Sequence, residues 1–146
     1  MTAKTRAIYA ATSVFVALKE ETTFRALIQS LLARRFGHLT AILGSTVLFT
    51  GYHAGTIPLL PFAYGQVLVA SLILGILYAR TQNLRLVICL HTAYDAMWSL
   101  TPIGVGQLFP YSIGLEALIG SLCLLVVWGR SSLWPLKQPI PTEPLK

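Results

Sequence analysis

The sequence predicts an all-α membrane protein, a polytopic bundle of about five transmembrane helices. Apolar residues make up 55% of the 146 residues and charged residues only 11%, less than half the charged share of an ordinary soluble domain. The mean hydropathy of +0.68 agrees. Apolar residues also gather in separate segments, and this pattern is typical of a multi-pass protein of the cell membrane. The five segments lie at about residues 7–33, 39–55, 62–79, 84–100 and 113–129.

The first segment, 7–33, is the least regular of the five. Residues 7–18 are apolar, but Lys19, Glu20, Glu21 and Arg25 follow before apolar character resumes at Ala26. A cleaved signal peptide is an alternative interpretation of this N-terminus. Because no small-x-small cleavage site follows the apolar run, we expect the segment to be retained.

The other segments are delimited by turns that carry glycine, proline or charge. Segment 39–55 contains Gly44, Gly51 and Gly55, which favour close approach of a neighbouring helix. Segments 84–100 and 113–129 are at the short end of the range of about 17 to 25 residues that spans a bilayer. The chain is thus divided into a start at 1–14, an intramembrane domain at 15–130 and a proline-rich tail at 131–146.

The basic residues indicate orientation in a membrane. The net charge of +6 could indicate nucleic acid in a soluble protein, but here the cations lie in turns between apolar segments, so we expect no nucleic-acid partner. Turns 34–38 and 80–85 and the tail are basic, while turns 56–61 and 101–112 carry no charge. The positive-inside rule then places the C-terminus in the cytoplasm. Lys4 and Arg6 disagree with this topology, so either the first segment does not cross fully or the chain lacks an upstream helix.

Ionisable residues inside the apolar segments point to a functional site. Each costs about 3 kcal/mol to place in a membrane, so several together must compensate one another. Three pairs of residues spaced four apart contain most of them, and this spacing places both members of a pair on one helix face. The pairs are Glu21 with Arg25, Phe49 with His53, and His91 with Asp95, and Glu20 points about 100° away from Glu21.

The depths of these residues are compatible with one intramembrane site. From the presumed cytoplasmic helix ends, a rise of about 1.5 Å per residue puts Glu20 about 20 Å deep, His53 about 21 Å, His91 about 10 Å and Asp95 about 16 Å. All four therefore lie within about 11 Å of depth.

In this order on successive helices, the motifs Glu20-Glu21-x-x-x-Arg25, Phe49-x-x-x-His53 and His91-x-x-x-Asp95 resemble those of the CPBP family. These are intramembrane proteases related to the type II CAAX prenyl endopeptidases, also called the abortive-infection (ABI) family. The resemblance covers about residues 15–130 and includes the approach to the third motif, from Gly75 to Arg85.

The resemblance implies a role for each matched position. Glu20 would activate the attacking water with His53 beside it, and His91 with Asp95 would hold the polarised carbonyl or a metal. Glu21, Arg25 and Phe49 would support the site. The substrate would be a membrane-embedded or lipid-modified peptide or protein.

The resemblance leaves the metal open, because the family has been interpreted both as zinc proteases and as metal-independent, glutamate-dependent proteases. Glu20, His53, His91 and Asp95 would be the ligands of a Zn²⁺ ion, which would lower the pKa of its bound water. The same groups could act without metal as general base and oxyanion donors. Many relatives carry Asn where this chain has Asp95, and an ionised Asp only accepts hydrogen bonds, which favours the metal slightly.

Two alternatives to a protease remain from the sequence. One is a non-proteolytic membrane protein on the same scaffold, with a role in bacteriocin immunity or as a partner of another membrane protein. Relatives usually carry further helices before the first motif, so a partner membrane protein could also complete the fold. The other is a proton-coupled transporter, which five short helices without visible repeats disfavour.

Overall fold

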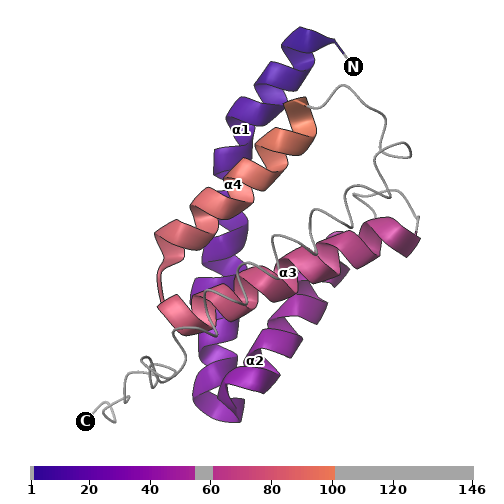
Figure 1. Cartoon of the computed structure of the whole chain (residues 1–146). Coiled ribbons are helices and arrows are strands. Elements are labelled where there is room, and N and C mark those ends of the chain that lie inside the picture. Colours follow the sequence, from indigo (N-terminus) through magenta and orange to yellow (C-terminus); the bar gives the residue numbers. More distant parts are fainter. Residues whose placement is uncertain (1, 55–60, 101–146) are drawn as a thin grey trace, which may run out of the picture.

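The computed structural model describes residues 2–54 and 61–100, and within these ranges the chain is helical and has no strand. The elements are α1 (Ala3–Glu21), the π-helical stretch η1 (Thr22–Gln29), α2 (Ser30–Tyr52), α3 (Pro61–Thr81) and α4 (Leu84–Leu100) (Figure 1). The all-α class is therefore confirmed for this part of the chain. The expected segment 113–129 and the tail 131–146 lie outside the described residues.

The first two apolar segments form a helical hairpin. α1, η1 and the start of α2 follow one another directly, from Ala3 onward. The chain then reverses at Gly37, whose φ of 82° and ψ of 167° interrupt α2; glycine takes a positive φ without steric cost. Beyond the reversal, the Ser45 hydroxyl donates to Gln29 Oε1 at 3.2 Å. The turn expected at 34–38 is present.

The π-helical stretch η1 is the local feature that the sequence pattern did not predict. It contains two buried polar side chains that are four residues apart and bind two positions on α3 that are also four residues apart. Arg25 Nη2 donates to Ser71 Oγ at 3.0 Å, and Gln29 Nε2 donates to the carbonyl oxygen of Gly75 at 2.8 Å. π-Helical turns are frequent at functional sites, and this one follows directly after the two glutamates.

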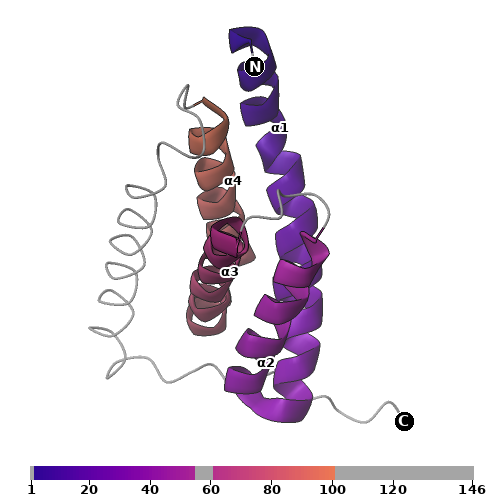
Figure 2. The same cartoon turned by 90° about the vertical axis from the view of Figure 1, so that its right-hand side faces the viewer.

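The elements pack as two pairs. α1 lies against α4 and runs antiparallel to it, as both cartoon views show, and α2 packs against η1 and α3 (Figures 1 and 2). A small apolar cluster of Leu74, Leu77, Tyr78 and Val87 joins α3 to α4. The expected close approach is seen at Gly44, where an added Cβ would lie 3.1 Å from Leu32. At Gly51, no described residue lies within 4 Å of such a Cβ.

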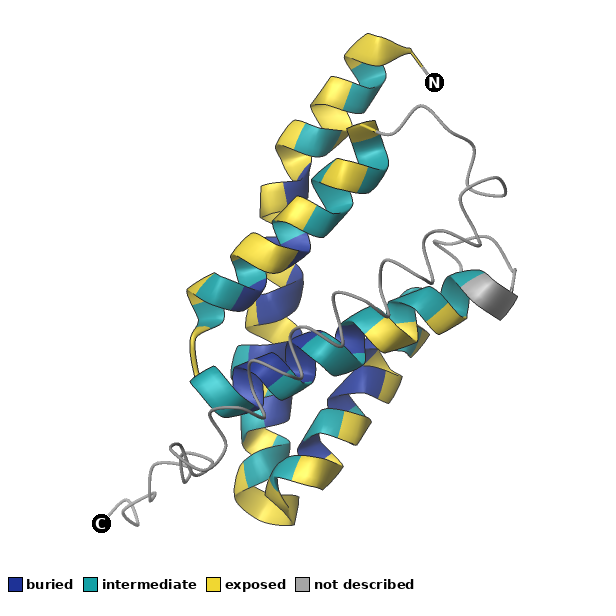
Figure 3. Ribbon diagram, viewed as in Figure 1, coloured by how far each residue is buried: buried dark blue, intermediate teal, exposed yellow. Residues whose placement is uncertain are grey.

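The pattern of burial differs from that of a typical water-soluble protein. Large apolar side chains face outward, with Phe15 exposed to 69%, Leu39 to 72% and Val47 to 66%. Buried residues gather where the elements cross (Figure 3), and they include polar and charged ones. The buried polar and charged residues are Ser13, Glu20, Glu21, Arg25, Gln29, Ser45, Thr46, Ser71 and His91. Exposed apolar area of this kind suits contact with lipid.

One helix in the described part of the chain, Ala63–Thr81, is long and apolar enough to cross a membrane by length and composition. It coincides with the expected segment 62–79 and forms most of α3. α4, with 17 residues, coincides with the expected segment 84–100.

Candidate functional site

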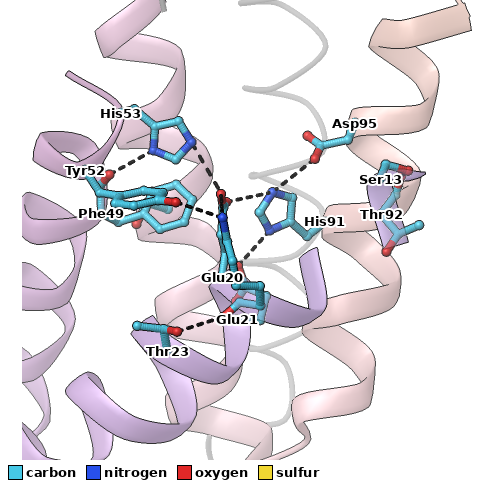
Figure 4. Close-up of polar contacts among 12 residues, drawn as sticks. Ser13, Glu20, Glu21, Thr23, Phe49, Tyr52, His53, His91, Thr92 and Asp95 are labelled. Atoms are coloured by element: carbon cyan, nitrogen blue, oxygen red, sulfur yellow. Dashed lines mark hydrogen bonds and ion pairs between the residues drawn. The ribbon is translucent and has the colours of Figure 1, made fainter. Parts of the chain in front are cut away.

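The candidate site is built around the buried carboxylate of Glu20, near the C-terminal end of α1. His53 approaches it from the end of α2, and His91 and Asp95 approach from one face of α4 (Figure 4). Glu20 Oε2 lies 3.9 Å from His53 Nε2 and 3.8 Å from His91 Nε2. These are the residues that the three sequence motifs contribute, and the fold brings them together.

Glu20 Oε2 is buried and has no hydrogen-bond partner among the described residues. Both imidazole nitrogens are too far away for a direct hydrogen bond, which needs about 2.7 to 3.2 Å. A buried carboxylate oxygen normally has a partner, and an exception calls for an explanation such as a catalytic role or a bound water. Its position between two histidines leaves it able to act on a small molecule that reaches all three side chains.

Hydrogen bonds on the other ring nitrogen fix the orientation of both histidines. His53 Nδ1 lies 2.9 Å from the carbonyl oxygen of Phe49, which can only accept, so Nδ1 carries the proton. His91 Nδ1 lies 2.8 Å from Glu21 Oε1 and donates to that carboxylate. In both neutral rings, therefore, the lone pair is on Nε2, the nitrogen that faces Glu20.

Glu21 serves two partners at once. Its Oε2 accepts from Arg25 Nε at 3.1 Å, the ion pair expected from their spacing, and both side chains are fully buried. Its Oε1 accepts from His91. This second contact was not predicted, because it joins two helices and nothing in the spacing along α1 points to it. Glu21 thus links the buried cation to a histidine of the site.

Arg25 and Phe49 pack against each other next to His53. The Arg25 guanidinium carbon lies 5.1 Å from the centre of the Phe49 ring, a cation–π contact. The same ring lies 4.6 Å from the His53 ring and packs edge-on against Phe24 at 5.0 Å. Phe49 therefore supports His53 by stacking as well as through its backbone carbonyl.

Asp95 lies on the outer side of His91, and its side chain is 30% exposed. Its Oδ2 lies 3.5 Å from His91 Nε2. The expected pairing of these residues is present, but it is Glu21 that bonds the Nδ1 of His91. Asp95 can influence only the nitrogen that faces the site.

A zinc ion requires ligand atoms that lie closer together than those around Glu20 Oε2. Ligand atoms at about 2.0 to 2.1 Å in a tetrahedral site lie about 3.3 Å from one another, whereas the separations around Glu20 Oε2 are 3.8 and 3.9 Å. Within residues 2–54 and 61–100, no group of three or more His, Cys, Asp and Glu side chains is arranged to hold a metal ion. The side chains as they stand do not fit a zinc site.

Two further residues reach the rim of the site, although the sequence analysis assigned neither of them to it. Lys19 Nζ donates to the hydroxyl of Tyr52 at 2.8 Å and lies 3.9 Å from Glu20 Oε1. The only available signal was their position beside Glu20 and His53 in the sequence. Ser71, which binds Arg25, had no signal of its own, because it comes from a helix without any motif.

Neither the search of curated proteins nor that of solved structures gave a match. A protein-family model, described as type II CAAX prenyl endopeptidase Rce1-like, matches residues 2–97. This range is well over half of the chain and includes all three motifs. The chain therefore belongs to the Rce1-like type II CAAX prenyl endopeptidases, a family of membrane-embedded proteases.

Proposed function

We propose that the chain is an intramembrane endopeptidase, which hydrolyses a peptide bond of a membrane-associated substrate with water activated by Glu20. The observation that carries this proposal is the position of Glu20 Oε2, buried without a hydrogen-bond partner among the described residues and facing Nε2 of both histidines. We place the attacking water between these atoms, at a hydrogen-bond distance of about 2.8 Å from each.

Glu20 and His53 have complementary parts in activating the water. A carboxylate accepts a proton, so Glu20 acts as the general base. The Nε2 lone pair of His53 accepts the second hydrogen of the water and orients the oxygen for attack on the carbonyl carbon. Phe49 supports this role of His53 in two ways, because its carbonyl oxygen fixes the tautomer and its ring packs against the imidazole.

His91 is placed to stabilise the oxyanion of the tetrahedral intermediate. In the protonated ring, Nδ1–H donates to Glu21 and Nε2–H faces the reaction. The negative charge of Glu21 favours this protonated form by a direct charge-assisted hydrogen bond. Glu20 then transfers the proton it took from water to the leaving amine, and the C–N bond breaks. The proton removed from water thus ends on the leaving amine, and Glu20 returns to its ionised state.

Asp95 is less suited than His91 to stabilise the oxyanion. An ionised carboxylate cannot donate to an oxyanion, and at 3.5 Å it competes for the Nε2–H of His91. We propose that Asp95 holds the protonated His91 in place between turnovers and yields it to the oxyanion during the reaction.

Zinc remains the alternative for the same four side chains, Glu20, His53, His91 and Asp95. It requires the atoms around Glu20 Oε2 to move closer together than 3.8 Å. No step above depends on the metal, and removing divalent ions separates the two mechanisms.

We further propose that the protein crosses the cell membrane several times, with about five helices and its C-terminus in the cytoplasm. The outward-facing apolar side chains and the apolar helix Ala63–Thr81 support this arrangement. The substrate would be a membrane-embedded or lipid-modified peptide or protein, because the site lies among apolar helices.

The test uses purified protein in lipid vesicles with a library of quenched, membrane-inserted peptides. Mass spectrometry in ¹⁸O-labelled water identifies new carboxyl ends that have gained the label. Wild type is expected to give labelled products, whereas Glu20→Ala, His53→Ala and His91→Ala give none, and Glu143→Gln in the tail is the matched control. A well-folded wild type that cleaves no member of the library would contradict the proposal and favour a non-proteolytic role in immunity or partner binding.

A further inference from the structure

A lysine and a tyrosine form an exposed polar pair at the edge of the site. The Lys19 side chain is 60% exposed, and its Nζ donates to the Tyr52 hydroxyl at 2.8 Å. The same nitrogen lies 5.2 Å from the centre of the Tyr52 ring. The pair joins the ends of α1 and α2, one residue before Glu20 and one residue before His53.

The hydrogen bonding leaves this pair with donors to spare. An ammonium group has three N–H donors and no acceptor, so in its contact with Lys19 the Tyr52 oxygen must accept. The phenol hydrogen is then directed away from Lys19 and can donate elsewhere. The nearest oxygen of Glu20 is 3.9 Å from Nζ, which is beyond hydrogen-bond distance. Ammonium and phenol together can therefore bind one anionic group.

The pair adjoins both groups that would activate the water. Lys19 Nζ is 3.9 Å from Glu20 Oε1, and the Tyr52 ring stands edge-on to the His53 ring, with the centres 5.5 Å apart. An anion bound there would lie beside the reacting peptide bond. A lysine among apolar segments of a membrane protein is costly, and such residues are commonly retained for binding or transport.

We infer that Lys19 and Tyr52 form a substrate subsite that recognises a carboxylate close to the scissile bond. The inference rests on the proposed function and adds to it a preference among substrates. The carboxylate belongs to an Asp or Glu side chain or to a free C-terminus of the substrate, since the chemistry of recognition is the same. Lipid phosphate is less suited, because the proposed topology puts Glu20 about 20 Å from the cytoplasmic helix end, away from headgroups.

The test compares pairs of peptides that differ only in one carboxylate. Membrane-inserted peptides carry Glu or Gln at single positions on either side of the scissile bond, and one further pair ends in a free acid or an amide. Wild type, Lys19→Met, Tyr52→Phe and the control Lys4→Met are assayed in vesicles of neutral lipid. The measured quantity is the ratio of kcat/KM within each pair.

In at least one pair, wild type is expected to prefer the carboxylate by about 10- to 100-fold, which is the value of one charge-assisted hydrogen bond. Lys19→Met should reduce this ratio to about one, Tyr52→Phe should reduce it in part, and Lys4→Met should keep it. Lys19→Glu should prefer a peptide with Lys at the same position, which a merely structural lysine would not produce.

Several results would overturn the inference. Equal cleavage within every pair by wild type, or an undiminished ratio in Lys19→Met, removes the subsite but leaves the protease. A preference that appears only when anionic lipid is added assigns Lys19 to the membrane surface instead. Failure of wild type to cleave either member of any pair counts against the proposed function itself.

Discussion

The buried ion pair of Glu21 and Arg25 offers a quantitative test of the structure. Both side chains are fully buried, with Arg25 Nε 3.1 Å from Glu21 Oε2. Each also has a partner on another helix, since Arg25 binds Ser71 and Glu21 binds His91. The perturbations are Glu21→Gln, Arg25→Met and the double variant.

The magnitude follows from the charge that each substitution leaves behind. Removing one member of a buried pair leaves an uncompensated buried charge and costs about 3 to 5 kcal/mol. The double variant leaves no charge behind, so it should cost less than the sum of the two single variants. We expect an interaction free energy of about 2 to 3 kcal/mol between the two sites. A loss of this size is a large part of the stability of a typical domain.

The assay is reversible unfolding in mixed micelles, followed by circular dichroism with increasing denaturing detergent. Thr12→Ala is the control, because Thr12 is exposed and should change the free energy of unfolding by less than about 0.5 kcal/mol. If each single substitution costs less than about 1 kcal/mol and the two costs add, the pair is not buried as described and the reasoning is refuted.

Three further predictions follow from single features. Asp95→Asn should retain or increase peptide cleavage, because an amide can donate to the oxyanion, and a loss of more than about tenfold in kcat would instead indicate that the carboxylate takes part. Gly37→Ala should lower the free energy of unfolding by about 1 to 3 kcal/mol, because φ of 82° with ψ of 167° is a conformation that essentially only glycine adopts. In the same denaturation assay Gly51→Ala should be neutral or stabilising, because no described residue lies within 4 Å of the added Cβ. Treatment with a zinc chelator should leave the cleavage rate unchanged, and a loss that added zinc restores would show that the side chains close around a metal.

Contacts within one helix were the part of the site that the sequence could predict. Glu21 and Arg25, Phe49 and His53, and His91 and Asp95 are each four residues apart, and helical periodicity alone places the members of each pair on one face. The reversal at Gly37 could also be anticipated, because charge and glycine interrupt the apolar pattern there.

Contacts between helices were beyond the reach of such reasoning. The bond from His91 to Glu21 depends on how α4 crosses α1, and the bond from Arg25 to Ser71 depends on the π-helical geometry of η1. Neither crossing angle nor a change from α- to π-helix is encoded in the spacing of apolar residues. For the same reason, the pairing of Lys19 with Tyr52 could not be predicted, because it depends on how the ends of α1 and α2 meet.

The central claim, that Glu20 activates the water, is tested most directly by comparing wild type with Glu20→Gln in lipid vesicles on one cleaved peptide. Glutamine keeps the size of the side chain but cannot take a proton, so kcat should fall by about 10²- to 10⁴-fold. The free energy of unfolding should stay the same or rise, because the substitution removes a buried charge whose Oε2 lacks a hydrogen-bond partner among the described residues. Cleavage by Glu20→Gln at more than about a tenth of the wild-type rate would contradict the claim.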